Sequence, residues 1–85
     1  MIKDSVTVIF QMHDRNQKVD IEIPLHITAN ELVIGLNAAY HLGIDVSNAK
    51  NCFLPAENPI ALLKGNRLLR DFGIHNGTVI HFVGL

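Results

Sequence analysis

The stretch Asn76-Gly77-Thr78-Val79-Ile80-His81-Phe82-Val83 decides the fold of this 85-residue chain. Its Asn-Gly pair is a strong signal for a tight, hairpin-type turn. The residues that follow are rich in β-branched and aromatic side chains, which favours a final strand over residues 78–83. Alternation along that strand would send Ile80 and Phe82 into the core.

Apolar residues separated by turns lie just before this strand, at Leu63, Leu69, Phe72 and Ile74. Residues 67–72 are expected to form a short strand or a single helical turn. Further back, residues 51–55 and 60–63 are predicted as the third and fourth strands, because turn-forming residues bound each of them.

The first part of the chain predicts a hairpin. Residues 5–12 alternate, and their apolar members on one face are Val6, Val8, Phe10 and Met12. Residues 18–23 also alternate, and the polar residues 13–17 separate the two runs. Pro24 cannot donate to a sheet ladder and should end the second strand.

A helix should follow this hairpin. Thr28-Ala29-Asn30-Glu31 matches a capping box, in which the Thr28 hydroxyl and the Glu31 carboxylate satisfy each other's backbone N–H groups. Apolar residues then recur at helical spacing, at Leu32, Leu36, Ala39 and Tyr40. Gly43 is predicted to supply the left-handed stop.

The expected order of elements is strand, strand, helix, strand, strand, strand, within one domain over residues 1–85. A mixed α+β sheet with one helix packed across it buries the apolar faces most simply. Because parallel pairing needs a long crossover, the helix should connect the second strand to the third, and the last strand should pair beside the first.

Composition excludes several classes of function. The seven basic and eight acidic residues give a formal net charge of −1, and no cluster of Lys or Arg is present to bind nucleic acid. No apolar run reaches 18 residues and no signal-peptide pattern opens the chain. Cys52 is the single cysteine. We therefore expect a cytoplasmic protein in a reducing compartment, with no direct membrane insertion.

No catalytic, cofactor or metal site is predicted. The five histidines, at positions 13, 26, 41, 75 and 81, lack the spacing of a ligand pair on a helix. Cys52 has apolar neighbours and is interpreted as a buried structural thiol. The carboxylates are scattered and show no acid/base pairing, at Asp14, Asp20, Glu22, Glu31, Asp45, Glu57 and Asp71.

The pattern as a whole resembles the ubiquitin-like β-grasp fold. The residues that carry the likeness are Thr28, Gly43-Ile44, Leu63, residues 69–74 and residues 78–83. Within that superfamily the chain is most similar to the YukD/EsaB-type proteins of type VII (WXG100, ESX-like) secretion loci in Gram-positive bacteria. The resemblance implies a small cytosolic accessory or regulatory protein whose partner is a membrane or cytosolic component of that machinery.

The end of the chain departs from ubiquitin. Conjugation and sulfur transfer both need a flexible tail that ends in Gly-Gly, whereas this chain ends Val83-Gly84-Leu85. We therefore expect a protein that docks on partners and is neither conjugated nor an enzyme. Two alternatives stay open: a ubiquitin-like carrier that is processed to expose Gly84, and a structural subunit of a multi-component enzyme.

The candidate protein-binding residues are outward-facing apolar positions. If Ile80 and Phe82 point inward, the outer face of the last strand carries Val79, His81 and Val83. Leu62 should face outward as well, because its neighbour Leu63 takes the inward position. Ile34 is an apolar exception on the polar side of the helix. The alternative is that isolated exposed aliphatic residues carry no function.

Overall fold

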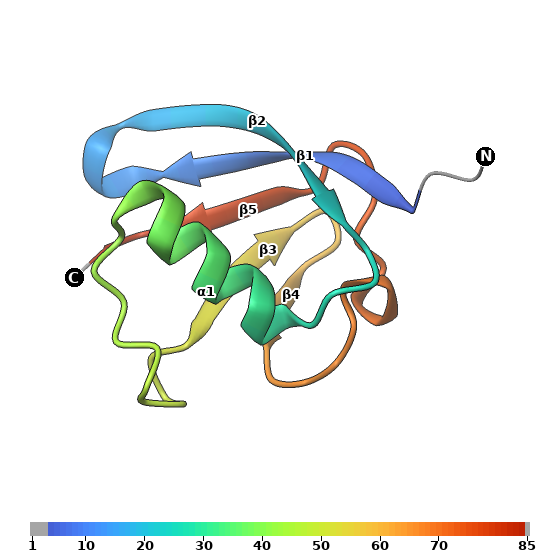
Figure 1. The fold of residues 1–85 in the computed structure, drawn as a ribbon. Helices are drawn as coiled ribbons and strands as arrows, with labels where there is room; N and C mark the ends of the chain where they lie inside the picture. The colour runs from blue at the N-terminus through green and yellow to red at the C-terminus, as the bar shows by residue number, and fades with distance from the viewer. Residues whose placement is uncertain (1–3, 85) are drawn as a thin grey trace.

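Five strands form one mixed sheet in the order β2-β1-β5-β3-β4, and helix α1 lies across one face of it (Figure 1). The computed structural model describes residues 4–84. The elements are β1 Ser5–Met12, the 3-10 turn η1 His13–Arg15, β2 Gln17–Pro24, α1 Ala29–Tyr40, β3 Phe53–Glu57, β4 Ala61–Lys64, the 3-10 turn η2 Leu69–Phe72 and β5 Val79–Phe82. This is the ubiquitin-like β-grasp architecture that the sequence predicts.

Strand β5 lies at the centre of the sheet. It runs parallel to β1, from Ile9 opposite Val79 to Met12 opposite Phe82. Its other edge pairs antiparallel with β3. Two hairpins flank it, β1–β2 and β3–β4. The last strand therefore lies beside the first, as predicted, and the segment that contains α1 makes the long crossover between the two hairpins.

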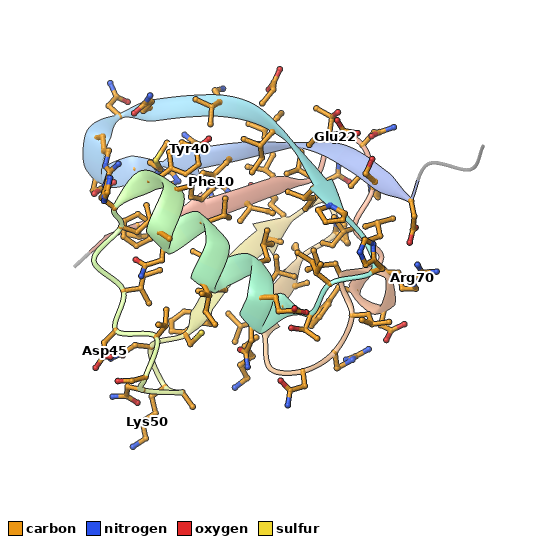
Figure 2. The ribbon with its side chains drawn as sticks, in the orientation of Figure 1. Phe10, Glu22, Tyr40, Asp45, Lys50 and Arg70 are labelled. Carbon is orange, nitrogen blue, oxygen red and sulfur yellow. The ribbon has the colours of Figure 1, made fainter. Side chains whose placement is uncertain are left out.

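The core lies between the sheet and α1. Alternate residues of the strands face the helix, and the buried residues include Val8, Phe10, Met12, Ile23, Leu54, Ala56, Leu63, Ile80 and Phe82. The helix contributes Ala29, Leu32, Val33 and Leu36. The ring of Phe10 meets the ring of Tyr40 edge-on at a centroid distance of 5.4 Å, near the end of α1 (Figure 2). Leu69, in η2, is also fully buried.

The predicted capping box opens α1. The Thr28 Oγ1 accepts from the Glu31 backbone N–H at 3.1 Å, and the Glu31 Oε1 accepts from the Thr28 backbone N–H at 2.9 Å. The hydrogen bond from the Thr28 backbone N–H, and after it the Thr28 side-chain hydroxyl, lower the pKa of the Glu31 carboxyl from its ordinary value. The box satisfies two N–H groups that would otherwise lack partners.

The end of α1 differs from the prediction. The helix ends at Tyr40, and His41 takes the left-handed conformation (φ 55°), two residues before Gly43. A side chain from another element binds this end of the helix. The Arg15 guanidinium of η1 donates to the carbonyl oxygens of Tyr40 at 2.6 Å and His41 at 2.9 Å. A cation at the carboxyl end of a helix also complements its dipole.

Strands β3 and β4 begin later than predicted. Turns occupy residues 48–52, where the Asn51 N–H bonds to Asn48 and the Cys52 N–H bonds to Ala49, so β3 begins only at Phe53.

Ala39, predicted on the buried face of the helix, is exposed at the edge of the apolar stripe. Within residues 4–84, no helix combines the length and apolarity needed to cross a membrane.

Replacing Thr28 with alanine should lower the free energy of unfolding by about 1 kcal/mol, because the Glu31 amide loses its acceptor. Urea denaturation followed by circular dichroism measures this loss. Thr28→Ser keeps the hydroxyl and should retain most of the stability. Equal losses in the two variants would show that the methyl group matters and the cap does not.

Replacing Glu31 with glutamine should destabilise the protein at pH 7 and lose its effect in acid. The folded-state pKa of Glu31 is lowered, so the carboxylate's contribution is present above the ordinary glutamate pKa and disappears as the pH falls through the lowered value. Urea denaturation of the wild type and of Glu31→Gln, at pH 7 and at about pH 2.5, measures the stability difference with the Glu31 carboxyl ionised and protonated. A stability difference that is the same at both pH values would contradict the capping role.

Replacing Arg15 with methionine should lower the free energy of unfolding by about 1 to 2 kcal/mol, because two carbonyl oxygens at the end of α1 lose a charged donor. Methionine retains a long side chain, and Lys18→Met, on an exposed position of β2, is the matched control. Thermal and urea unfolding measure both variants. No difference between them would show that solvent replaces the arginine at no cost.

Candidate functional site

The candidate site is the outer face of the sheet, which we define as the side turned away from α1. On β5 this face carries Val79 and His81, and both are half-buried. Their register partners on β1 are Ile9 and Gln11. Glu57 of β3 lies opposite Val79 on the other side. Side chains of paired residues share a face, so these positions form continuous rows across three strands.

Apolar side chains extend the outer face over the β3–β4 hairpin. Leu62 is 45% exposed and lies opposite Pro55, while Phe53 is 39% exposed and lies opposite Lys64. Val83, which follows β5, is 67% exposed. The four predicted residues Leu62, Val79, His81 and Val83 therefore belong to one face of the sheet.

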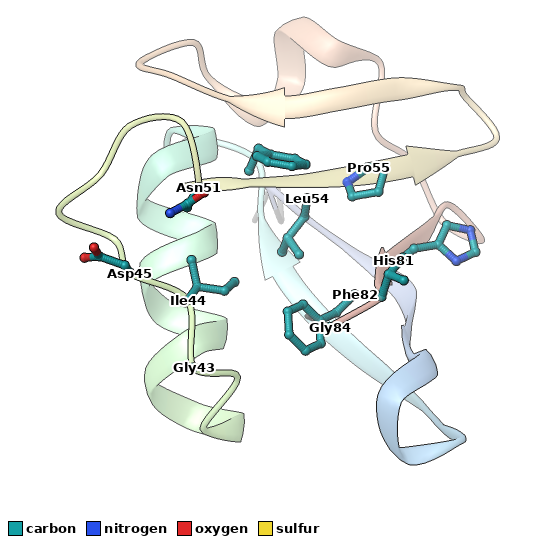
Figure 3. Close-up of a pocket in the computed structure, with 11 residues that line it drawn as sticks. Gly43, Ile44, Asp45, Asn51, Leu54, Pro55, His81, Phe82 and Gly84 are labelled. Carbon is teal, nitrogen blue, oxygen red and sulfur yellow. The ribbon is translucent and has the colours of Figure 1, made fainter.

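A groove of about 370 Å³ adjoins the outer face where β3 and β5 separate (Figure 3). Their recorded pairing covers Ala56 opposite Ile80 and Glu57 opposite Val79, and ends beside Pro55. Proline has no amide hydrogen for a sheet ladder, which is a physical reason for the pairing to stop there. The lining residues are Gly43, Ile44, Asp45, Asn51, Phe53, Leu54, Pro55, His81, Phe82, Val83 and Gly84.

Ile34 is not part of this face. It is 47% exposed on α1, and the helix covers the opposite side of the sheet. It lines a second hollow of about 310 Å³ together with Val46, Cys52 and Lys64. The structure therefore separates Ile34 from the other four predicted residues.

Cys52 is buried, as predicted. Its Sγ lies 3.7 Å from the Asn30 Oδ1, and only 5% of the residue is exposed. Within residues 4–84, no group of three or more histidine, cysteine, aspartate or glutamate side chains is arranged to hold a metal ion.

A chain of three polar side chains lies at the edge of the outer face. The Glu57 Oε1 and the His81 Nε2 are 3.0 Å apart, and the His81 Nδ1 and the His13 Nε2 are 2.8 Å apart. The two imidazole rings stack with centroids 5.0 Å apart. The positions of these two histidines in the sequence do not predict this contact. They meet because β5 runs parallel to β1, which carries His81 to the end of β1 where η1 begins.

Sequence reasoning also missed Phe53 and Pro55 as members of the face. The signal was present in the alternation of β3, because an inward Leu54 requires its two neighbours to point outward. The predicted bounds of residues 51–55 placed Phe53 in the middle of the strand and only Pro55 at its end. The face as observed offers apolar contact area bordered by charged side chains, an arrangement that is typical of protein-binding surfaces.

Several solved structures are similar to this chain. A ubiquitin-like domain from tubulin-binding cofactor B has a TM-score of 0.75 at 15% identity, with 99% of this chain and 93% of that chain covered. The C-terminal ubiquitin-like domain of mouse tubulin-specific chaperone e has a TM-score of 0.68 at 15% identity, covering 100% and 93%. The ubiquitin-like domain of Plasmodium falciparum Dsk2 has a TM-score of 0.59 at 19% identity, covering 91% and 96%.

Identities this low show the fold alone, and they establish it as ubiquitin-like. A search of curated proteins finds no match. A family description does match, over residues 5–82, and it covers nearly the whole chain, from the start of β1 to the end of β5. That description is "WXG100 protein secretion system (Wss), protein YukD", and the chain therefore belongs to the YukD family.

Proposed function

We propose that this protein is a non-enzymatic accessory or regulatory component of a WXG100 secretion system. It acts in the cytoplasm by docking its outer sheet face on a protein component of the machinery. Membership of the YukD family supports the choice of system. The observation that carries the docking role is the apolar area of the outer face, with Phe53, Leu62 and Val83 each more than one-third exposed beside an open groove.

Burial energetics support a modest, reversible interaction. Full burial of a Leu, Val or Phe side chain contributes about 1.5 to 3 kcal/mol. The exposed parts of Phe53, Leu62 and Val83 could therefore contribute a few kcal/mol between them. Association itself costs about 4 to 15 kcal/mol. A partner must therefore add contacts elsewhere, and the groove is the feature that can supply them.

The groove can receive an apolar side chain of the partner. Its volume of about 370 Å³ lies within the usual range of ligand pockets, about 300 to 1,000 Å³. Leu54 and Phe82 line it from the core side, while Phe53 and Val83 line it from the outer face. An anchor residue in such a pocket typically contributes a large part of the binding energy.

Charged side chains border the apolar area. Lys64 lies opposite Phe53 at one edge of the sheet, and Lys18 lies opposite Gln11 toward the other edge. Glu57 is 64% exposed at its side chain and sits next to His81. Charged groups around an apolar centre mainly set the orientation and selectivity of docking.

The double variant Leu62→Lys/Val83→Lys should bind the partner at least tenfold more weakly, because two exposed aliphatic side chains of the outer face become charged. The measurement is calorimetric titration of purified cytosolic domains of the membrane components of the same secretion system. Both positions are exposed, so circular dichroism and the thermal midpoint should change little.

Ile34→Lys is the matched control, because it makes the same chemical change at a similarly exposed residue on the helix side. It should bind like the wild type. Equal weakening by Ile34→Lys would place the interface on the helix, and unchanged binding by the double variant would remove the outer face from the proposal.

A further inference from the structure

We propose that the hydrogen-bonded pair His13–His81 makes the docking face sensitive to pH. The face keeps its binding geometry while the two imidazoles share a hydrogen bond, and it loses that geometry when both rings are protonated. This inference rests on the proposed docking function and adds a regulation to the same site. Its structural basis is the chain from Glu57 through His81 to His13.

The hydrogen bonds assign the protons at neutral pH. The Glu57 carboxylate can only accept, so the His81 Nε2 donates to it across 3.0 Å. In the neutral ring the His81 Nδ1 is then an acceptor, and the His13 Nε2 donates to it across 2.8 Å. Every nitrogen in these two contacts has a defined role, so the chain fixes the orientation of both rings.

One additional proton leaves this arrangement intact. A proton added at the His13 Nδ1 makes that ring cationic without changing its donation to His81. A proton added instead at the His81 Nδ1 makes the His81 ring cationic beside Glu57. The His81 Nδ1 then donates to the His13 Nε2, which is an acceptor when neutral His13 carries its proton on Nδ1. Either singly protonated state keeps a donor facing an acceptor between the rings.

The second proton breaks the contact between the rings. All four ring nitrogens then carry hydrogens, so two donors face each other across 2.8 Å. Two cations also lie in stacked rings whose centroids are 5.0 Å apart, and their Coulomb repulsion adds to the lost hydrogen bond. Because histidine side chains in general take up protons between about pH 5 and 8, acidification is the change that tests this contact.

Charged groups of both signs lie around the pair. Glu57 contacts His81, and its carboxylate is shared with solvent. On η1, Asp14 lies 3.6 Å from the cationic Arg15, whose guanidinium is bound to carbonyl oxygens at the end of α1. Lys18 of β2 adds a positive charge in the row that runs through Gln11 to His81.

Loss of the hydrogen bond between the rings affects the docking face through the His81 side chain. This side chain lines the groove with Phe53, Pro55 and Val83, so a change in its orientation changes the groove wall. His13 is exposed and belongs to η1, whose Arg15 is tied to the end of α1. Docking then requires that the two rings are not both cationic, and the apparent dissociation constant rises as the doubly protonated fraction grows.

The test compares each protein with itself at two pH values, with the same purified cytosolic domains as the probe. In the wild type, the dissociation constant at pH 5.5 should exceed that at pH 7.5 by about tenfold. In His13→Gln the ratio of the dissociation constants at pH 5.5 and pH 7.5 should stay below about twofold. His81 can still bind Glu57 in this variant, and no second imidazolium lies beside it. His26→Gln changes an exposed histidine outside the chain and should keep the wild-type ratio.

The outcomes separate the two proposals. Failure of the wild type to bind any of the domains at pH 7.5 counts against docking itself. Binding with the same pH ratio in wild type and His13→Gln overturns the histidine proposal and leaves docking in place. Nuclear Overhauser contacts between the rings of His13 and His81 give a readout without a partner. They should be present at pH 7.5 and absent at pH 5.5, and their persistence with both rings protonated would overturn the proposal.

Discussion

The parallel pairing of β1 with β5 is the constraint on which the rest of the structure depends. It joins the first and last strands in the middle of the sheet, with Phe10 opposite Ile80 and both fully buried. The two hairpins are local structures, and neither alone encloses a core. Once β5 lies between them, one face of the sheet is continuous and α1 can cover it. The same register fixes which side chains of β5 point outward.

The register also explains why the polar and apolar features of the outer face lie together. His81 and Val83 come from the end of β5, while Phe53 comes from the start of β3. Because β3 runs antiparallel to β5, these two ends meet. Pro55 lies at the point where pairing between the two strands stops, and the groove opens there. The outer face of the sheet thus has both exposed apolar side chains and the groove, while the residues of the core stay buried.

The turn η1 connects three parts of the fold. Its Arg15 binds the carbonyl oxygens at the end of α1, and its His13 contacts His81 at the end of β5. Gly84 also passes close to Asp14, since a Cβ at Gly84 would lie 2.9 Å from the Asp14 Cβ. A short polar turn that the sequence shows only as a hairpin connection therefore contacts both the end of α1 and one side of the outer face.

The sequence alone determined the features that depend on neighbouring residues. Alternation predicted β1, β2 and β5, the capping box predicted the start of α1 at Thr28, and the apolar pattern predicted that Leu63 faces inward and Leu62 outward. These properties follow from local periodicity and from hydrogen bonds between residues three positions apart. The fold class followed from the order of these elements, whereas the resemblance to the YukD family rested on sequence landmarks such as residues 69–74.

Tertiary structure alone decided the features that join distant residues. The Tyr40 carbonyl oxygen at the end of α1 accepts from a guanidinium 25 positions earlier, and the contact of His13 with His81 spans 68 positions. The groove beside Pro55 requires two strands that separate, and Ile34 proved to lie on the far side of the molecule from the outer face. Sequence periodicity states which way a side chain points along its own element. It contains no information on which other element will lie opposite, because that depends on how all the apolar faces are buried together.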